Sequence, residues 1–305
     1  MRVLVTGSKG FIGQAVIKVL QEKGHSIHEF DYSIGQNILR REDLEKALND
    51  AHAVIHLAAL TDETKSEKEL FEVNVEGTKN VLESAGKAGV KHVIYLSTVG
   101  IYGPTTKEAL NEESPCNPIT PYEQSKKAAE EVVQEYQEVV PITILRSALA
   151  LGPSTYWAQI FKTVKKGFPL IGKGENKWQI VYIKDLAQAI AFVLGKEEVF
   201  GETYLVAEEK GKTLFELVQR IGTLVGRPEI KTIPVWLGMA LAHVFALQGK
   251  ITGKRPLLIP KHVRRMLKER NYDISKLKAL GWKPRYDTDA ALKETFEALK
   301  EKKMI

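Results

Sequence analysis

A tyrosine and a lysine four residues apart, Tyr122 and Lys126, are the side chains of this sequence best suited to moving a proton. On a helix, residues at this spacing lie on the same face. A phenol has a pKa near 10 in water, and a neighbouring cation lowers that pKa by stabilising the phenolate. We therefore expect Tyr122 to exchange a proton with a substrate hydroxyl. The same spacing is also common in plain surface pairs, so its meaning depends on the motifs around it.

Three glycines near the N-terminus form a second pattern, Thr6-Gly7-Ser8-Lys9-Gly10-Phe11-Ile12-Gly13, which follows an apolar run and precedes a helical stretch. Gly7 allows a tight turn, Gly10 lets the backbone approach a pyrophosphate, and Gly13 lets the helix pack closely on a strand. The helix N-terminus then offers free N–H groups and a positive dipole end to the phosphates. The pattern predicts dinucleotide binding, and an ordinary glycine turn is the alternative.

Asp31 lies 18 residues after Gly13, at the end of the second expected strand. A carboxylate in that place accepts hydrogen bonds from the ribose hydroxyls and repels a 2′-phosphate, which favours NAD over NADP. The alternative is an aspartate that only caps a turn. Arg40 and Arg41 follow nearby and could hold a phosphate, although they equally suit the start of a solvated helix.

Strands and helices alternate through the first half of the chain, with apolar strands that predict a parallel sheet covered on both faces. The expected strands are Val3–Thr6, Ser26–Asp31, Ala53–Leu57, Val90–Ser97 and Ile142–Arg146. Capping-box patterns at Ser66 and Thr120 predict the starts of two helices. We expect an α/β fold: a doubly wound parallel Rossmann sheet over residues 1–150, and a smaller, mainly helical substrate domain over residues 151–305, of which 178–196 pack back onto the first.

Thr98 directly follows the strand expected at Val90–Ser97. Ligands of open parallel sheets bind in the crevice at the carboxyl ends of the strands. We therefore expect the Thr98 hydroxyl to hydrogen-bond a substrate oxygen and hold it toward Tyr122.

Taken together with further motifs, these patterns resemble the extended short-chain dehydrogenases/reductases over nearly the whole chain. The further motifs are His56-Leu57-Ala58-Ala59, Asn74-Val75-Glu76-Gly77-Thr78, Thr98…Tyr102-Gly103, Arg146…Gly152-Pro153, Val181–Ala187 and Leu280-Gly281-Trp282-Lys283-Pro284. The resemblance implies a catalytic triad of Thr98, Tyr122 and Lys126, with Lys126 also holding the nicotinamide ribose. We expect the positively charged nicotinamide ring to act with the lysine in lowering the Tyr122 pKa. The resemblance further implies a homodimer.

The residues expected to contact NAD, from the glycine pattern and the resemblance together, are Gly7, Lys9, Gly10, Phe11, Ile12, Gly13, Asp31, Asn37, Ile38, Leu57, Ala58, Ala59, Asn74, Tyr122 and Lys126. For Asn74, a buried asparagine that packs between helices is an equal alternative.

Departures from the family pattern bear on the substrate. Val99 and Gly100 stand where sugar dehydratases carry Asp and Glu, which disfavours a dehydratase. Leu149 and Trp178 stand where nucleotide-sugar enzymes usually carry an Asn and a diphosphate-binding Arg. Loss of such a charge-assisted contact costs on the order of 1.5–3 kcal/mol. Lys173 or Lys177 could substitute for that arginine.

The favoured function is therefore an NAD-dependent oxidoreductase that interconverts a secondary alcohol and a ketone on a fairly apolar small molecule, similar to 3β-hydroxysteroid dehydrogenases and dihydroflavonol reductases. The alternatives are a nucleotide-sugar 4-epimerase with tightly bound NAD and a non-catalytic binding module. The candidate substrate contacts are Leu149, Trp157 and Trp178, and Trp157 with Phe161 is alternatively a helix packing pair.

An apolar stretch over residues 234–247 precedes a basic segment, 250–270, with eight basic residues against one acid, Glu269. The stretch is shorter than the roughly 20 residues needed to span a bilayer. It predicts either a core or pocket helix or a helix at a membrane interface.

Composition excludes several protein classes. The 305 residues are 44% hydrophobic and 27% charged, which excludes disorder, and the single cysteine, Cys116, allows no internal disulfide. No signal-peptide pattern is expected. The net charge is +6, but no nucleic-acid-binding motif accompanies it, so nucleic-acid binding is not expected. His56 has no partners at metal-ligand spacing, so no metal is expected. We expect a cytoplasmic enzyme.

Overall fold

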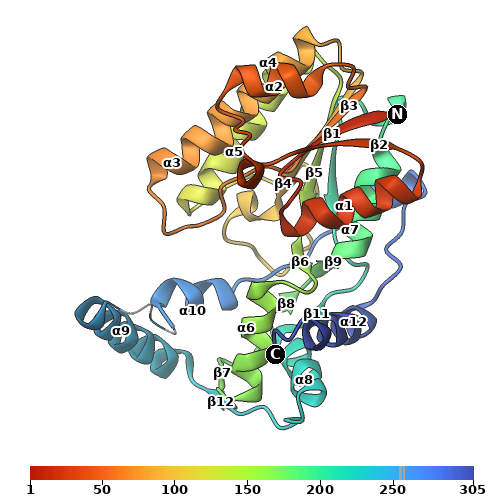
Figure 1. Ribbon diagram of the computed structural model, residues 1–305. Coiled ribbons are helices and arrows are strands. Elements are labelled where there is room, and N and C mark those ends of the chain that lie inside the picture. The colour runs from red at the N-terminus through yellow and green to blue at the C-terminus, as the bar shows by residue number, and fades with distance from the viewer. Residues whose placement is uncertain (254–255, 257) are drawn as a thin grey trace.

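A six-stranded, entirely parallel sheet forms the centre of the first half of the molecule (Figure 1). The computed structural model describes residues 1–253, 256 and 258–305. The strand order is β10-β5-β4-β3-β1-β2. The strands are β1 (Arg2–Thr6), β2 (Ser26–Phe30), β3 (Ala53–His56), β4 (His92–Thr98), β5 (Ile142–Ser147) and β10 (Thr203–Val206). This order confirms the expected doubly wound Rossmann sheet.

Helices cover both faces of this sheet (Figure 1). One face carries α1 (Phe11–Glu22) and α7 (Ile183–Val193), and the other carries α2 (Arg41–Leu48), α3 (Glu67–Phe71), α4 (Gly77–Lys87) and α5 (Pro121–Glu135). Successive strand residues point to opposite faces. Accordingly, Val3 and Val5 pack in the core beneath α1, whereas Leu4 packs in the core beneath α2 and α4. Each face thus has its own apolar core.

The two predicted capping boxes form. Ser66 begins α3 and Thr120 begins α5, each accepting from the backbone N–H of the glutamate three residues later. The helix that follows Ser66 continues through a π-helical turn, η2 (Glu72–Glu76), into α4. Short 3-10 turns, which are η1 (Tyr32–Ile34), η3 (Val99–Tyr102) and η4 (Glu197–Val199), complete this half.

The second half is mainly helical, as expected. Its helices are α6 (Thr155–Lys165), α8 (Leu214–Leu224), α9 (Val235–Thr252), α10 (Pro260–Met266), α11 (Ser275–Ala279) and α12 (Thr288–Glu301). Pairs of short strands join them: β6 (Leu149–Leu151) with β9 (Ile180–Tyr182), β7 (Leu170–Ile171) with β12 (Thr232–Ile233), and β8 (Lys177–Trp178) with β11 (Lys212–Thr213). Residues of α6, α8 and α12 share one apolar core.

The chain returns to the first half more than once after residue 150. Helix α7 packs beneath the sheet, and β10 extends the sheet at its β5 edge. Tyr272 and Trp282 belong to the same core as α1 and α7. Strand β10 was not expected, because it lies among helices beyond Gly152-Pro153, where the alternation of strands and helices that marks the sheet has ended. None of the described helices is long and apolar enough to cross a membrane.

Candidate functional site

The glycine turn between β1 and α1 is as tight as its spacing predicts. Gly7 has a φ of +70°, and a Cβ there would lie 2.8 Å from the backbone nitrogen of Ala58. A Cβ on Gly13 would overlap the carbonyl oxygen of Gly7. Both positions therefore require glycine.

The N-terminus of α1 is open to an anion. Gly10 is the N-cap, no described side chain caps the helix, and the first turn has no acidic residue. The buried Ser8 hydroxyl has no hydrogen-bond partner among the described residues. Free N–H groups at a helix N-terminus beside a partnerless hydroxyl fit the pyrophosphate of a dinucleotide.

Asp31 stands at the carboxyl end of β2 beside this turn. Its carboxylate accepts from the backbone N–H of Lys9 at 3.0 Å and from the N–H and hydroxyl of Ser33 at 2.9 and 2.7 Å. Partial burial acts to raise the Asp31 pKa, but the hydrogen bonds from Ser33 and Lys9 outweigh it and lower the pKa below its ordinary value. Asp31 therefore caps the turn, as in the alternative interpretation. Its carboxylate remains negatively charged at the place expected for the ribose of a dinucleotide.

The remaining expected cofactor contacts surround the same edge. Leu57 and Ala58 donate their backbone N–H groups to the Thr6 hydroxyl, both at 3.2 Å, which positions the loop after β3. Lys9 forms an ion pair with Glu29. Ile38 is buried, and the other expected contacts are partly buried: Phe11, Ile12, Asn37 and Ala59.

Asn74 forms the buried packing contacts of its alternative interpretation. It is 1% exposed, accepts from the Leu60 N–H at 2.7 Å, and donates to the Leu60 carbonyl and the Ser125 hydroxyl. It thereby joins the loop after β3 to helix α5.

The three expected catalytic residues come from β4 and α5. Thr98 ends β4, and its hydroxyl accepts from the Gly100 N–H at 3.0 Å. Tyr122 lies in the first turn of α5 and is partly exposed. Lys126, one turn later, is buried, donates to the Leu96 carbonyl at 2.8 Å and lies 4.1 Å from the centre of the Tyr95 ring.

Burial dominates the titration of the tyrosine–lysine pair. It lowers the pKa of Lys126 to about 7, with Glu130 acting in the opposite direction. It raises the pKa of Tyr122 to about 12, while the nearby Arg265 acts to lower that pKa.

In the protein alone, Lys126 does not offset the effect of burial on the Tyr122 pKa, and the second charge of the expectation, that of the nicotinamide ring, comes only with NAD. The two side chains form no hydrogen bond with each other in the part of the chain that the structure describes, because the Lys126 amine donates to the Leu96 carbonyl instead. The positive charge that lowers the phenol's pKa must come from elsewhere, and the nicotinium ring of bound NAD carries one.

Helix α10 faces Tyr122, a contribution that the motifs did not predict. Arg265 is close enough for its charge to act on the phenol. Lys261 pairs with Glu63 at 2.5 Å, and Lys268 pairs with Glu123 at 3.1 Å. These ion pairs tie the basic segment to the loop before α3 and to the start of α5. The excess of positive charge over residues 250–270 was the only sequence signal for this element.

Arg270 is the second residue that sequence reasoning missed. Its guanidinium lies 4.0 Å from the centre of the Trp178 ring, and the residue as a whole is 8% exposed. Among the described residues it forms no ion pair, and its one hydrogen bond is a long one, 3.4 Å to the Arg265 carbonyl. Burial lowers its pKa from the usual value. A buried guanidinium without an acidic partner is costly unless an anion compensates it.

The three candidate substrate contacts differ in position. Leu149 is partly buried. Trp178 is 6% exposed and donates its indole N–H to the Met266 carbonyl at 3.1 Å. Trp157 is buried with Phe161 in the core of the second half and donates to the Ala150 carbonyl at 2.7 Å. This burial favours the packing-pair interpretation of Trp157 and Phe161.

His56 is a core residue, as expected. It lies between the hydroxyls of Thr6 and Thr78, at 2.7 and 3.0 Å, and burial lowers its pKa to about 3. No cluster of three or more potential metal ligands occurs among the residues that the structure describes.

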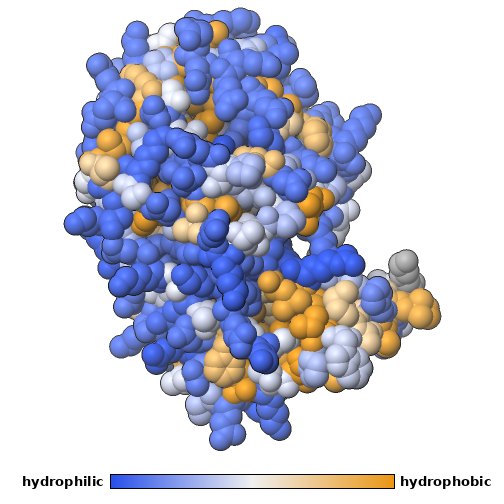
Figure 2. All heavy atoms as spheres, turned by 180° about the vertical axis from the view of Figure 1, so that it is seen from behind, coloured by the Kyte–Doolittle hydropathy of each residue, from blue (hydrophilic) through white to orange (hydrophobic). Residues whose placement is uncertain are grey.

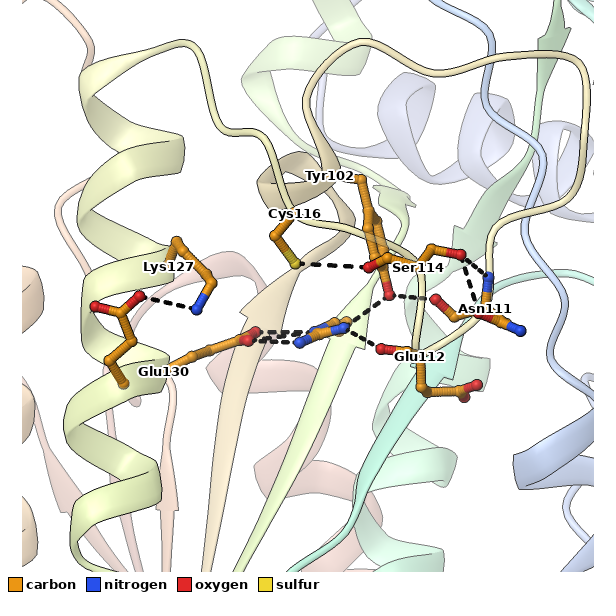
Figure 3. Close-up of polar contacts among 9 residues, drawn as sticks. Tyr102, Asn111, Glu112, Ser114, Cys116, Lys127 and Glu130 are labelled. Atoms are coloured by element: carbon orange, nitrogen blue, oxygen red, sulfur yellow. Dashed lines mark hydrogen bonds and ion pairs between the residues drawn. The ribbon is translucent and has the colours of Figure 1, made fainter.

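A buried ionic network supports the loop that leads from β4 to α5 (Figure 3). Arg146 on β5 donates to Glu130 on α5 at 2.8 Å and to the Tyr102 hydroxyl and Glu112 carbonyl, both at 2.8 Å. Tyr102 in turn donates to the Asn111 carbonyl. Cys116 lies beside this network, 3.9 Å from the Ser114 carbonyl. The network fixes the loop whose end positions Tyr122.

Comparison with known proteins gives a family match over residues 3–207, to the family described as "NAD dependent epimerase/dehydratase family". The N-acetyl-alpha-D-glucosaminyl-diphospho-ditrans,octacis-undecaprenol 4-epimerase of Escherichia coli is 27% identical over 316 residues, covering 97% of this chain and 94% of that protein. The 3-beta-hydroxysteroid dehydrogenase of Mycolicibacterium neoaurum is 26% identical over 332 residues, covering 96% of this chain and 90% of that protein.

A crystal structure of UDP-glucose 4-epimerase with UDP-glucose from Thermotoga maritima has the same fold. It superposes with a TM-score of 0.81 at 24% identity, covering 100% of both chains.

Proposed function

The chain belongs to the NAD-dependent epimerase/dehydratase family and uses NAD as its cofactor, and from this premise we propose that it inverts the C4 hydroxyl of a hexose carried on a diphosphate. In this proposal, residues 1–150 hold the cofactor and residues 151–305 supply the substrate contacts. The proposal reverses the order of the two leading sequence-based hypotheses, in which an apolar alcohol was favoured over a sugar.

The main support for this proposal is the position of the Arg270 guanidinium. The replacement of the usual diphosphate-binding arginine by Trp178 was the main argument against such a substrate. Arg270, from the C-terminal segment, brings a guanidinium onto the face of that same tryptophan. It lacks an acidic partner among the described residues, and Arg265 lies nearby with its charge also unpaired there. A diphosphate would compensate both charges.

The relatives support the same substrate class. The Escherichia coli relative acts on a sugar joined to undecaprenol through a diphosphate, and the Thermotoga maritima structure contains UDP-glucose. The feature common to both is a hexose on a diphosphate, whatever lies on its other side. We therefore assign the diphosphate-linked hexose, and not a particular nucleotide, as the substrate class.

The site residues have distinct tasks in this reaction. NAD, held over the Gly7–Gly13 turn and beside Asp31, would supply reversible hydride uptake at C4. Tyr122 holds the proton of the C4 hydroxyl and returns it after inversion, and Thr98 hydrogen-bonds the same oxygen. Lys126, with a pKa near 7 set by burial, supplies a positive charge when protonated. Val99 and Gly100 follow Thr98 without an acid–base group, so elimination chemistry is disfavoured.

A second candidate is oxidation of an apolar secondary alcohol. Leu149, at a position where sugar enzymes usually carry an asparagine, supports this candidate. The relation to the 3-beta-hydroxysteroid dehydrogenase supports it as well.

The two candidates are separated by net NADH formation. The chain is incubated with NAD and, in turn, UDP-glucose, UDP-N-acetylglucosamine, polyprenyl-diphosphate N-acetylglucosamine and a 3β-hydroxysteroid. We expect NMR to detect the C4-inverted sugar with no net rise in NADH absorbance. Stoichiometric NADH from the steroid, with no inversion of any sugar, would reject the epimerase.

The role of Arg270 is tested in the same assay. Arg270→Met should raise KM for the diphosphate-linked sugar roughly 10- to 100-fold, because one charge-assisted contact is lost. Arg264→Met is the matched control, since Arg264 is exposed and forms no ion pair among the described residues. Equal KM values in both variants would reject the assignment of Arg270.

A further inference from the structure

Helix α9 projects from the body of the molecule (Figure 1). It is 18 residues long, begins after Pro234 and contains no acidic residue. Viewed from behind, hydrophobic residues cover much of this projecting part (Figure 2). The core-helix interpretation of the apolar stretch therefore holds only for one side of α9.

That inner side rests on β7. A Cβ on Gly238 would overlap the side chain of Ile171, so the helix backbone lies directly against the strand. Ala242 is fully buried in the same small cluster, together with Val263 of α10. This contact holds α9 in place and leaves its opposite side without a partner among the described residues.

The opposite side is apolar and exposed. Four apolar side chains on this side are mostly exposed: Trp236 (72%), Val244 (60%), Leu247 (61%) and Ile251 (77%). At 3.6 residues per turn these four side chains fall within about 80° of the helix circumference. They form one stripe, which is called the α9 stripe below. Contiguous exposed apolar surface of this kind marks a binding surface.

Positive charge follows the stripe directly in the chain. Arg264 on α10 is exposed and forms no ion pair within the described part of the chain. Lys254 and Arg255, also in the basic segment, lie outside the described residues. An apolar helix face followed in the chain by a basic segment is a combination that binds at the interface of an anionic membrane.

We propose that the α9 stripe docks this protein onto an anionic lipid bilayer, with α9 lying in the plane of the interface. Trp236, near the start of the helix, is suited to the headgroup level, where tryptophan is enriched. A second copy of the chain is the competing occupant, and charge argues against it. A two-fold contact joins two copies that each carry a net charge of +6, with eight basic residues against one acid over the segment that directly follows the stripe. The proposal is independent of the reaction catalysed.

Trp236 is a native probe of this contact. The other three tryptophans, Trp157, Trp178 and Trp282, are at most 6% exposed. Transfer of Trp236 from water to lipid should therefore shift the fluorescence of the intact protein to shorter wavelength. We expect this shift, together with flotation of the protein, with phosphatidylglycerol-containing vesicles, and at least a tenfold weaker response with phosphatidylcholine vesicles.

Variants distinguish vesicle binding through the α9 stripe from nonspecific adsorption. Leu247→Ser combined with Ile251→Ser should abolish flotation, and Arg264→Glu should weaken it several-fold. Val139→Ser is the matched control, because Val139 is 58% exposed on the first half of the molecule, and it should float like the unaltered chain. Circular dichroism of each variant checks that it is folded.

Two outcomes would overturn the proposal. One is recovery of the unaltered protein in the soluble fraction with no fluorescence shift. The other is a shift that appears on raising the protein concentration without vesicles, together with dimer formation that the double serine variant removes. The second outcome would assign the stripe to a second copy of the chain.

Discussion

Tyr122 and Lys126 are both held away from their ordinary titration ranges by burial. The phenol has a pKa of about 12 and the amine a pKa of about 7 in the protein alone. Each shift favours the neutral form, so near pH 7 the phenol is neutral and the amine is only partly protonated. A positive charge introduced next to Tyr122 lowers its pKa toward neutrality. The site is therefore expected to become active only in the complex with oxidised cofactor.

Replacing the phenol tests this residue directly. Tyr122→Phe removes one hydroxyl and should lower kcat by about 10²–10⁴-fold, which is the usual contribution of a positioned acid–base group. NAD affinity, measured by calorimetry, should change less than about threefold, since hydrophobic contacts of the ring remain. Retained turnover in this variant would reject Tyr122 as the proton carrier.

At the scale of elements, the loop between β4 and α5 depends on one buried ion pair. Glu130 on α5 has no exposed surface and pairs with Arg146 on β5. The pair connects the strand and helix that flank the site, and Tyr102 and Glu112 attach the loop to it. The positions of Thr98 and Tyr122 thus rest on contacts made far from the reacting atoms.

Removing one partner of this pair should be strongly destabilising. Arg146→Met leaves Glu130 buried without compensation, and we expect a loss of about 3–5 kcal/mol in the free energy of unfolding. The double variant, Arg146→Met with Glu130→Leu, should regain most of that loss. Denaturant titration measures both, and a double variant no more stable than the single one would contradict the argument.

The junction of β4, β5 and the end of α7 should make stability depend on pH. The neutral ring of His92 accepts from the Gly195 N–H at 3.0 Å, and its other nitrogen lies 2.9 Å from the Thr143 hydroxyl. Burial lowers the His92 pKa from 6.5 to about 4. Between these values the unfolded chain binds the additional proton, so stability is present above pH 6.5 and is lost as the pH falls toward 4.

We expect His92 to contribute a slope of about 1.4 kcal/mol per pH unit in that window. His92→Gln, although less stable at neutral pH, should show a slope smaller by this amount. Denaturant titrations between pH 6.5 and 4 measure both slopes, and equal slopes would show that His92 titrates normally in the folded protein.

At the scale of the whole molecule, local patterns predicted the sheet and the glycine turn, whereas contacts between distant segments were not predictable. The positive φ of Gly7 and the close contact of Gly13 with the Gly7 carbonyl belong to one turn, and the Ser66 and Thr120 boxes act within three residues. The approach of Arg270 to Trp178 joins segments 92 residues apart, and the two residues also form a β-bridge. No spacing in the sequence predicts such a contact. The sequence therefore showed that Trp178 stands in place of the usual arginine, but not that Arg270 brings another guanidinium to the same place.

The same long-range arrangement brings the basic segment of the second half to the start of α5 and Tyr122, through the Lys268–Glu123 ion pair and the charge of Arg265. In the proposed epimerase, this arrangement would hold the sugar by its diphosphate while C4 faces Tyr122. The epimerase proposal therefore depends on diphosphate binding by the second half and proton transfer by Tyr122 at one site.

The most direct test uses a diphosphate-linked hexose with deuterium at C4, chosen from the substrates that the chain turns over. An epimerase returns the same hydrogen isotope to the carbon from which it was taken. We therefore predict a C4-inverted product that retains its deuterium, observed by NMR, with no label in free NADH or in water. Deuterium accumulating in free NADH, with a ketone as the released product, would contradict the claim and assign a dehydrogenase.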